Sequence, residues 1–522
     1  MSPKRGRRGG SATAAGAAAA ASAPPPTAGE QQASGAGAAA RLNDLPDDVM
    51  VQIFDRLLSK GGIPPKEARL AHLALVCRRW YQLCHCPQLL RHVLALLPLL
   101  RWSRPRPMVP PSLENAHEEW ASFRAWMQRH GAKVGSLAMM PSWIEPAPSA
   151  GERRRLFCTL WCCLKPCEVA GACLAELEAQ LPPGPEALPT HLSRLHSLRG
   201  MKLGSIGGEL SPLAALTGLQ RLELEHLHPT RPVQLPTGLT TLRLCVREGV
   251  PLPCVGLAAL TALAQLELTA VEEADCALPA DVCSALPRLQ QLTLLRLSGW
   301  DSLPAGLVCS ISSLAGLRLL HLSSLCEGIA SEQERERTST ELDRTLGTLS
   351  QLSSLILCNV HFLDRPPAAL AQLQQLQGLQ VACANWAPRP TLPAGPWLSR
   401  IRRLSCDWEL LHASSAALAA AATPALEHLL VVFFFFELRA EPNRGLGLPD
   451  FWAWLWRWAK GHPALRCLEL DEIDNTEDAG LVGCHRSVTA AMKRLRKQRP
   501  DMEATDDAST SCFWSKLGSV RK

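Results

Sequence analysis

The most regular feature of the chain is a repeated spacing of apolar residues. They recur at successive offsets of three, three, two and three residues, as in Leu216, Leu219, Leu222, Leu224 and Leu227. One copy between positions 286 and 300 fits two registers, anchored at Leu292 or at Leu295. With Leu295, the anchors are Met201, Leu222, Leu242, Leu266, Leu295, Leu320, Leu355, Leu379, Leu404, Leu429 and Leu468. Most intervals between them fall within about 20–29 residues, a period typical of stacked structural repeats.

Each copy predicts a short strand whose alternating leucines point into a core, while the residue between them points to the opposite, concave surface. A single repeat cannot bury its leucines, but stacked neighbours can, and each buried leucine then contributes about 1.5–3 kcal/mol. The pattern therefore predicts an α/β solenoid with short parallel strands. Two long intervals hold the segments SEQERERTSTELDR and FWAWLWRWAK, which we expect outside the strand ladder.

The residues between the strand leucines are the candidates for a binding surface. In chain order they are Lys202, Glu223, Arg243, Glu267, Arg296 (Thr293 in the other register), His321, Ile356, Gln380, Ser405, Leu430 and Glu469. Charge signs alternate in the first half, which argues against a strip for DNA, RNA or a polyphosphorylated substrate. The later half is nearly uncharged, so we expect the apolar anchor of a protein partner near Ile356 and Leu430, with the charged strands steering it. The alternative is that Ile356 and Leu430 are covered by the tail or a neighbouring loop.

A different pattern begins at Arg41, where an Ala-rich stretch gives way to RLNDLPDDVMVQIFDRLL. Pro46 suits the first turn of a helix, and Val49, Ile53, Phe54 and Leu57 fall on one helical face. A second helical periodicity runs from Leu70 to Leu83. The prolines between Pro98 and Pro111 exclude a long helix there and predict a connector.

The segments LPDDVMVQIFDRLL and LALVCRRWYQL resemble the F-box, in which both dock onto a Skp-type adaptor. The family's hallmark positions are held by Leu45, Pro46, Ile53, Phe54, Leu57, Leu75, Val76, Cys77 and Trp80. The segment SKGGIPPKEAR between the two helices is longer than usual, and no Trp closes the module directly after Leu89-Leu90. The later repeats resemble the leucine-rich-repeat family, although the position usually held by Asn or Cys carries Leu227, Val271, Leu325 and Val360.

These resemblances imply a domain order and a function. The expected domains are a disordered tail at 1–41, a small all-α F-box at 42–90, a Pro-rich connector at 91–117, the solenoid at 118–476 and a basic, poorly defined tail at 477–522. F-box proteins with such repeats are similar, as a class, to non-catalytic substrate receptors of Skp–cullin–F-box ubiquitin ligases. One alternative is a scaffold that binds the adaptor outside a ligase, and another is a small-molecule-gated receptor similar to those for plant hormones.

Composition narrows the remaining function classes. The net charge of +6 is small for 522 residues, which is not a nucleic-acid-binding signature, and no apolar run is long enough to cross a bilayer. Cys158, Cys162, Cys163 and Cys167 lack the spacing of a zinc site, so we interpret them as buried structural thiols. We see no catalytic motif, and no residue pattern indicates a cofactor or a metal. We therefore expect an intracellular protein of the cytoplasm or nucleus.

The basic stretch of Lys493, Arg494, Arg496, Lys497 and Arg499 is predicted to be a solvated helix face rather than a site for nucleic acid or acidic lipid.

Residues 1–41 cannot bury enough apolar surface to fold alone, because fifteen of the first forty are Ala and only Glu30 is acidic. A transit peptide or a nuclear signal at Lys4-Arg5-Gly6-Arg7-Arg8 would have a similar composition. We predict that deleting residues 1–41 leaves the melting temperature and adaptor binding unchanged. A fall of several degrees would show that the segment packs, and a fluorescent fusion that loses its compartment would reveal a targeting signal.

Overall fold

The computed structural model describes residues 46, 49–50, 52, 92–95, 123–139, 154, 158, 161–168, 172–180, 188–204, 209–227, 233–247, 254–271, 277–300, 303–304, 306–325, 331–363, 365–382, 390–419, 422–433, 448–472 and 492–505. Contacts divide the chain into two units, Met1–Met50 and Val51–Lys522. In the first, the Met50 N–H donates to the Pro46 carbonyl at 3.0 Å. This bond closes a helical turn at Pro46, whose fixed φ suits a helix start.

The described part of the second unit is built on one 15-stranded sheet in which every neighbouring pair is parallel. Its strands follow the chain in order: β1 (His92–Ala95), β2 (Ser136–Met139), β3 (Glu176–Gln180), β4 (Gly200–Gly204), β5 (Arg221–Leu227), β7 (Thr241–Arg247), β9 (Gln265–Val271), β10 (Leu294–Ser298), β11 (Leu319–Leu325), β12 (Ser354–Val360), β13 (Gly378–Ala382), β14 (Arg403–Asp407), β15 (His428–Phe433), β16 (Cys467–Glu472) and β17 (Glu503–Thr505). A separate two-stranded sheet pairs β6 (Val233–Gln234) with β8 (Cys254–Val255). Strands that pair in sequence order define a solenoid.

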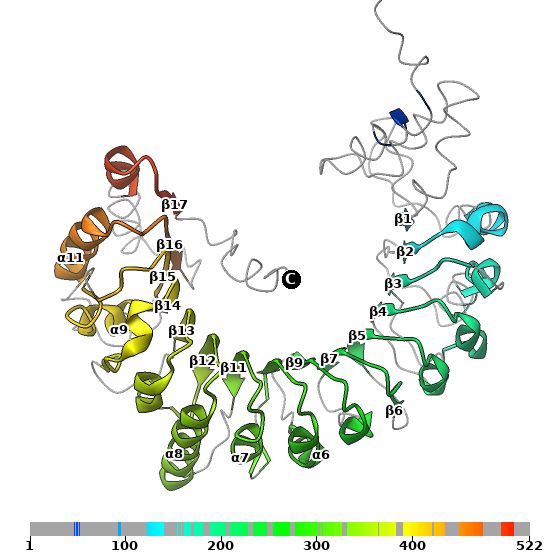
Figure 1. Cartoon of the computed structure of the whole chain (residues 1–522), viewed down its shortest axis with the longest axis horizontal. Helices are drawn as coiled ribbons and strands as arrows, with labels where there is room; N and C mark the ends of the chain where they lie inside the picture. Colours follow the sequence, from blue (N-terminus) through cyan, green and yellow to red (C-terminus); the bar gives the residue numbers. More distant parts are fainter. Residues whose placement is uncertain are drawn as a thin grey trace, which may run out of the picture. The chain divides into compact units, whose positions relative to one another are not determined.

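The connections between strands carry short helices that lie on one side of the main sheet (Figure 1). The α-helices are α6 (Ala280–Ala285), α7 (Leu307–Ile311), α8 (Glu332–Thr348), α9 (Trp408–Ala413) and α11 (Leu448–Gly461). The 3₁₀ helices are η3 (Gly131–Lys133), η4 (Lys165–Glu168), η5 (Thr190–Arg194), η6 (Ser211–Ala215), η7 (Leu257–Ala259), η8 (Leu286–Arg288), η9 (Ala368–Gln372) and η10 (Pro396–Ser399). Residues 123–130 and 492–498 are also helical. We call the other side of the sheet its open face.

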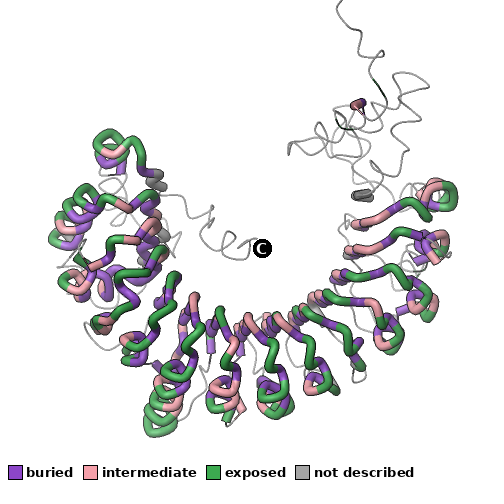
Figure 2. Tube along the Cα trace, viewed as in Figure 1, coloured by how far each residue is buried: buried purple, intermediate pink, exposed green. Residues whose placement is uncertain are grey.

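The core lies between the strands and these helices, and alternating leucines build it. Leu222, Leu266 and Leu355 are fully buried, and buried positions follow one another from strand to strand (Figure 2). Leu295 lies opposite Leu266 on one side and Leu320 on the other. The register anchored at Leu295 is therefore the one adopted, which places Arg296 rather than Thr293 on the open face.

The sheet extends beyond both limits predicted for the solenoid. Strand β1 lies inside the predicted connector, and β17 lies inside the predicted C-terminal tail. The run of prolines begins only at Pro98, so it leaves the preceding residues free to donate to a strand ladder. In the tail, Met492, Leu495 and Met502 are buried and supply the apolar contacts that the basic composition concealed.

Both long intervals place their inserted segments outside the strand ladder, as predicted. Helix α8 begins at an N-cap in which the Ser331 hydroxyl accepts from the Glu334 N–H at 3.2 Å. Its first two turns are exposed, whereas its second half packs into the core through the buried side chains of Leu342 and Leu346. Helix α11 buries Phe451 and Leu455, and its Trp458 indole donates to the Leu418 carbonyl at 2.7 Å.

The basic C-terminal helix follows its predicted role with one exception. Lys493, Arg494, Arg496 and Lys497 are exposed. Arg499 instead donates to the carbonyls of Ala459, His462 and Leu465 at 3.3, 3.0 and 2.9 Å, around the end of α11. A guanidinium there satisfies carbonyls that the last helical turn leaves unpaired and complements the helix dipole.

Trp300 occupies the turn position at which leucine-rich repeats usually carry a polar side chain. The register of β10 and β11 makes Trp300 equivalent to Leu325, and Leu325 to Val360. Leu325 and Val360 are fully buried, whereas Trp300 is both buried and bonded, its indole N–H donating to the Leu268 carbonyl at 3.1 Å. Apolar packing therefore holds this turn, and at the Trp300 repeat a side-chain hydrogen bond supplements it.

The residue before this position has positive φ in three consecutive repeats, at Gly299 (75°), Ser324 (50°) and Asn359 (49°). A Cβ on Gly299 would lie 2.2 Å from the Ala270 carbonyl oxygen. Glycine therefore lets the chain turn sharply there and present Trp300 to the core.

We predict that Trp300→Phe destabilises the repeats around β10 by about 2–3 kcal/mol, because it removes the indole bond and part of a buried ring. Hydrogen exchange should quicken in β9, β10 and β11 and stay unchanged in β15 and β16, since repeats couple mainly to their neighbours. Trp456→Phe is the control, because Trp456 is only half-buried in α11. Equal exchange changes in the two variants would contradict the role given to Trp300.

Candidate functional site

The middle positions of the strands form one continuous line across the open face. By strand register this central row is Ala138, Glu178, Lys202, Glu223, Arg243, Glu267, Arg296, His321, Ile356, Gln380, Ser405, Leu430 and Glu469. All the positions predicted from the sequence to share this surface are consecutive in it. Ala138 and Glu178 were missed, because their strands keep the offsets of three and two residues but carry Met139 and Ala179 in place of the second strand leucine.

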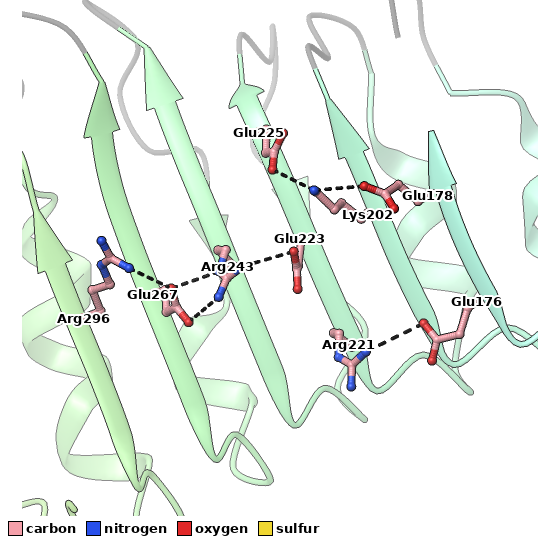
Figure 3. Close-up of polar contacts among 9 residues, drawn as sticks. All are labelled: Glu176, Glu178, Lys202, Arg221, Glu223, Glu225, Arg243, Glu267 and Arg296. Atoms are coloured by element: carbon pink, nitrogen blue, oxygen red, sulfur yellow. Dashed lines mark hydrogen bonds and ion pairs between the residues drawn. The ribbon is translucent and has the colours of Figure 1, made fainter. Parts of the chain in front are cut away.

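The strongest ion pairs of the central row are centred on Arg243. Its guanidinium donates two hydrogen bonds to the Glu267 carboxylate, at 2.9 and 2.8 Å, and its Nη1 lies 3.4 Å from Glu223 (Figure 3). Hydrogen bonding to Glu267 and its negative charge raise the pKa of Arg243 further above its usual value. The Glu267 side chain is 10% exposed and the Arg243 side chain 45%, so one partner is nearly buried and the other half-solvated.

Similar pairs continue toward the N-terminal strands. Lys202 Nζ lies 2.9 Å from Glu178 and 3.3 Å from Glu225, and Arg221 lies 3.9 Å from Glu176 (Figure 3). The hydrogen bond from Lys202 to Glu178 raises the pKa of this lysine. Together with Arg296, these residues form a charge ladder of five carboxylates and four cations.

The charge ladder changes the role expected of these side chains. Parallel strands lie about 4.8 Å apart, so alternating signs along the row place each charge beside an opposite one. Each charge is largely neutralised by its oppositely charged neighbours. This weakens the long-range electrostatic steering of a partner that was expected from these strands. The ladder still supplies a polar surface of fixed geometry.

Arg296 ends the ladder and is less well paired than its neighbours. Its Nη1 lies 3.8 Å from Glu267, beyond hydrogen-bond distance, and its side chain is 42% exposed. Its Nε is buried without a hydrogen-bond partner. The next residue of the row, His321, carries no charge at neutral pH, because burial, and then the nearby Arg296, lower its pKa to about 3.

The two apolar candidates of the later strands are barely accessible. Ile356 and Leu430 are each 5% exposed, and Ser405 between them is fully buried. A partner would therefore touch little of either side chain in this conformation. Gln380 is half-buried.

Accessible apolar side chains lie instead two residues before the central row. Leu294 and Leu319 are adjacent in register and partly exposed. The same alternation that assigned the central row places residues two positions away on the same face. The sequence pattern thus also places Leu294 and Leu319 on the open face, although they lie outside the row predicted between the strand leucines.

A compact cluster of side chains on β10 and β11 therefore combines apolar, charged and hydroxyl groups. Two strands contribute three positions each, and we call this the β10/β11 patch: Leu294, Arg296, Ser298, Leu319, His321 and Ser323. Among them, the Ser323 hydroxyl donates to Ser298 Oγ at 2.8 Å and lies 3.1 Å from His321 Nε2.

Of the four clustered cysteines predicted to be buried structural thiols, only Cys163 and Cys167 are buried. Burial raises the pKa of Cys163 and of Cys167 to about 12, and the Cys167 thiol donates to the Gly131 carbonyl at 3.4 Å. Cys158 is exposed and Cys162 half-buried. Across the described residues, no group of three His, Cys, Asp or Glu side chains is arranged to hold a metal.

The predicted adaptor-binding positions lie mostly outside the described residues. Pro46 is described and exposed. The others are Leu45, Ile53, Phe54, Leu57, Leu75, Val76, Cys77 and Trp80, whose placement stays a prediction.

Comparison with protein families provides the evidence for this N-terminal region. Residues 42–95 match the family model described as F-box-like. The chain carries an F-box-like domain. The leucine-rich-repeat solenoid built from the parallel sheet follows this domain in the sequence.

Solved structures similar to the chain include two proteins of low sequence identity. One is the plant peptide hormone receptor RGFR1 in complex with RGF2, with 13% identity and a TM-score of 0.31, covering 66% of this chain and 49% of the receptor chain. This chain thus spans about half of that receptor. The other is internalin C2 of Listeria monocytogenes, with 16% identity and a TM-score of 0.22, covering 40% of this chain and 73% of the internalin. No curated protein matches the sequence.

Among the helices that the structure describes, none combines the length and apolar character required to cross a membrane.

We predict that Glu267→Gln lowers the free energy of unfolding by about 1–2 kcal/mol, because a nearly buried carboxylate that holds Arg243 is removed. Glu176→Gln is the matched control in the same ladder. Its carboxylate is half-exposed and 3.9 Å from Arg221, so we expect a change of about 0.5 kcal/mol or less. Urea unfolding measures both, and equal costs would show that the Arg243–Glu267 geometry adds nothing.

Proposed function

We propose that the protein is the substrate-recognition subunit of a Skp–cullin–F-box ubiquitin ligase. The F-box-like domain binds a Skp-type adaptor, and through it a cullin, while the open face of the solenoid captures a protein substrate. The observation that carries the proposal is the F-box-like match at residues 42–95 on the same chain as a long repeat sheet.

The open face suits a protein partner better than a polyanion. The charge ladder joins five carboxylates to four cations, so a phosphate backbone would meet as much repulsion as attraction. Its side chains are held by hydrogen bonds and ion pairs, which reduces the entropy lost when a partner orders them. A rigid surface of mixed polarity favours a protein with complementary groups.

In this proposal the chain is a receptor and not an enzyme. Ubiquitin transfer takes place on a separate conjugating enzyme, and the receptor raises the effective concentration of a substrate lysine near the thioester. Such an assembly works inside the cell, in the cytoplasm or the nucleus.

The test is affinity purification of the full-length protein from cells, with adaptor and cullin quantified together. Leu45→Ala combined with Pro46→Ala, or Trp80→Ala alone, should remove the adaptor, because losses of about 2 kcal/mol or more per anchor are ordinary at interface hot spots. Ile63→Ala with Pro64→Ala is the matched control. It changes an apolar–proline pair in the segment SKGGIPPKEAR, outside the hallmark positions.

Two results would overturn parts of the proposal. Undiminished adaptor on the Leu45/Pro46 variant would exclude binding through the F-box-like domain. Adaptor without cullin on the wild type would favour a scaffold that acts outside a ligase. Circular dichroism on each variant shows that the solenoid remains folded.

A further inference from the structure

Arg296 has hydrogen-bonding capacity that the fold leaves unused. The Glu267 carboxylate between the two arginines is occupied by Arg243 at 2.9 and 2.8 Å and approaches Arg296 only to 3.8 Å. On the other side lies His321, which is neutral. Within the described part of the chain, the partly exposed guanidinium therefore has no acceptor at hydrogen-bond distance. A planar guanidinium with free N–H groups binds carboxylate or phosphate oxygens, often through two bonds.

A second donor lies beside it on the same strand. With the proton of His321 on Nε2, the imidazole donates to Ser323 Oγ at 3.1 Å, and Ser323 donates to Ser298 Oγ at 2.8 Å. This order leaves the Ser298 hydroxyl hydrogen free to donate outward. Ser298 and Arg296 are two residues apart in β10, so both project from the open face.

A pair of apolar side chains lies on the other side of Arg296. Leu294 and Leu319 are neighbours in register and partly exposed. Positions two residues apart in a strand are separated by about 6.7 Å. An extended peptide running along the strands has the same spacing, so its alternate side chains fit the leucine pair and Arg296 together.

We propose that the β10/β11 patch is a subsite for an anionic side chain of an extended peptide, flanked two residues away by an apolar side chain. The inference rests on the proposed function, because it names the chemistry of the protein that the open face captures. The anionic group is either the carboxylate of Asp or Glu or a phosphorylated hydroxyl.

The position of the patch in the ladder favours this chemistry. Arg296 is the last charge of the central row before Glu469, with the uncharged residues from His321 to Leu430 between them. A cationic side chain would meet Arg296 and the donor Ser298, neither of which offers it a negative charge. The long basic strip that a nucleic acid requires is absent, because the neighbouring central-row charges are paired.

The test measures binding of short fluorescent peptides to the full-length protein by anisotropy. Twelve-residue Gly/Ser peptides carry Leu-Ala-Glu, Leu-Ala-Gln, Leu-Ala-phosphoserine or Leu-Ala-Ser at their centre, and a second set carries the reversed order. We expect the wild type to prefer Glu over Gln, or phosphoserine over Ser, by about tenfold or more, the range of a charge-assisted hydrogen bond. Which anion is preferred identifies its source.

Arg296→Gln should abolish this preference, and Arg296→Lys should retain part of it. Arg335→Gln removes the same charge from the exposed start of α8 and should leave the preference intact. Ser298→Ala tests the patch without touching the arginine, and should reduce the preference about threefold or more.

The proposal is overturned if no peptide binds, if the wild type does not discriminate between charged and neutral peptides, or if discrimination survives Arg296→Gln. These outcomes do not depend on adaptor or cullin. Loss of cullin with an intact peptide preference would remove the ligase function and keep the subsite. Retention of cullin without any preference would do the reverse.

Discussion

The structure depends on one constraint, the burial of alternating leucines against the same leucines in the next repeat. Leu266, Leu295 and Leu320 are fully buried and lie side by side in register. A slip of one residue would turn each leucine toward the open face. The register of every strand is therefore fixed by its core, and the residues between the leucines are aligned across the sheet as a consequence. The alignment of the central row thus follows from the strand register that leucine burial imposes.

This dependence explains how much of the fold could be predicted. The leucine spacing gave the strands, the solenoid and most of the central row, since both faces follow from one period-2 rule. It could not choose between Leu292 and Leu295, because the leucines around them match the spacing in either register. It also missed β1 and β17, which lie outside the predicted solenoid, and the hydrogen bond from the Trp300 indole to the Leu268 carbonyl.

The candidate site was predicted less completely, for a different reason. Which residues face outward is a local property of a strand, but which of them remain accessible depends on all their neighbours. Ile356 and Leu430 occupy the predicted row and are nevertheless 5% exposed, whereas Leu294 and Leu319 keep accessible surface. Pairing is equally non-local. Arg243 and Glu267 are 24 residues apart in sequence, and only the stacking of repeats brings them together.

Core and open face are thus nearly independent, because alternate residues of a strand serve different sides of the sheet. Residues such as Ser298 can vary with the partner while the leucines stay constant, which is how a solenoid changes specificity without changing its fold. Glu267 is the exception. It belongs to the open face, yet its side chain is only 10% exposed and lies between two arginines. Because its two short bonds go to Arg243, Glu267 both stabilises the ladder and leaves Arg296 available, so stability and recognition are coupled at this one carboxylate.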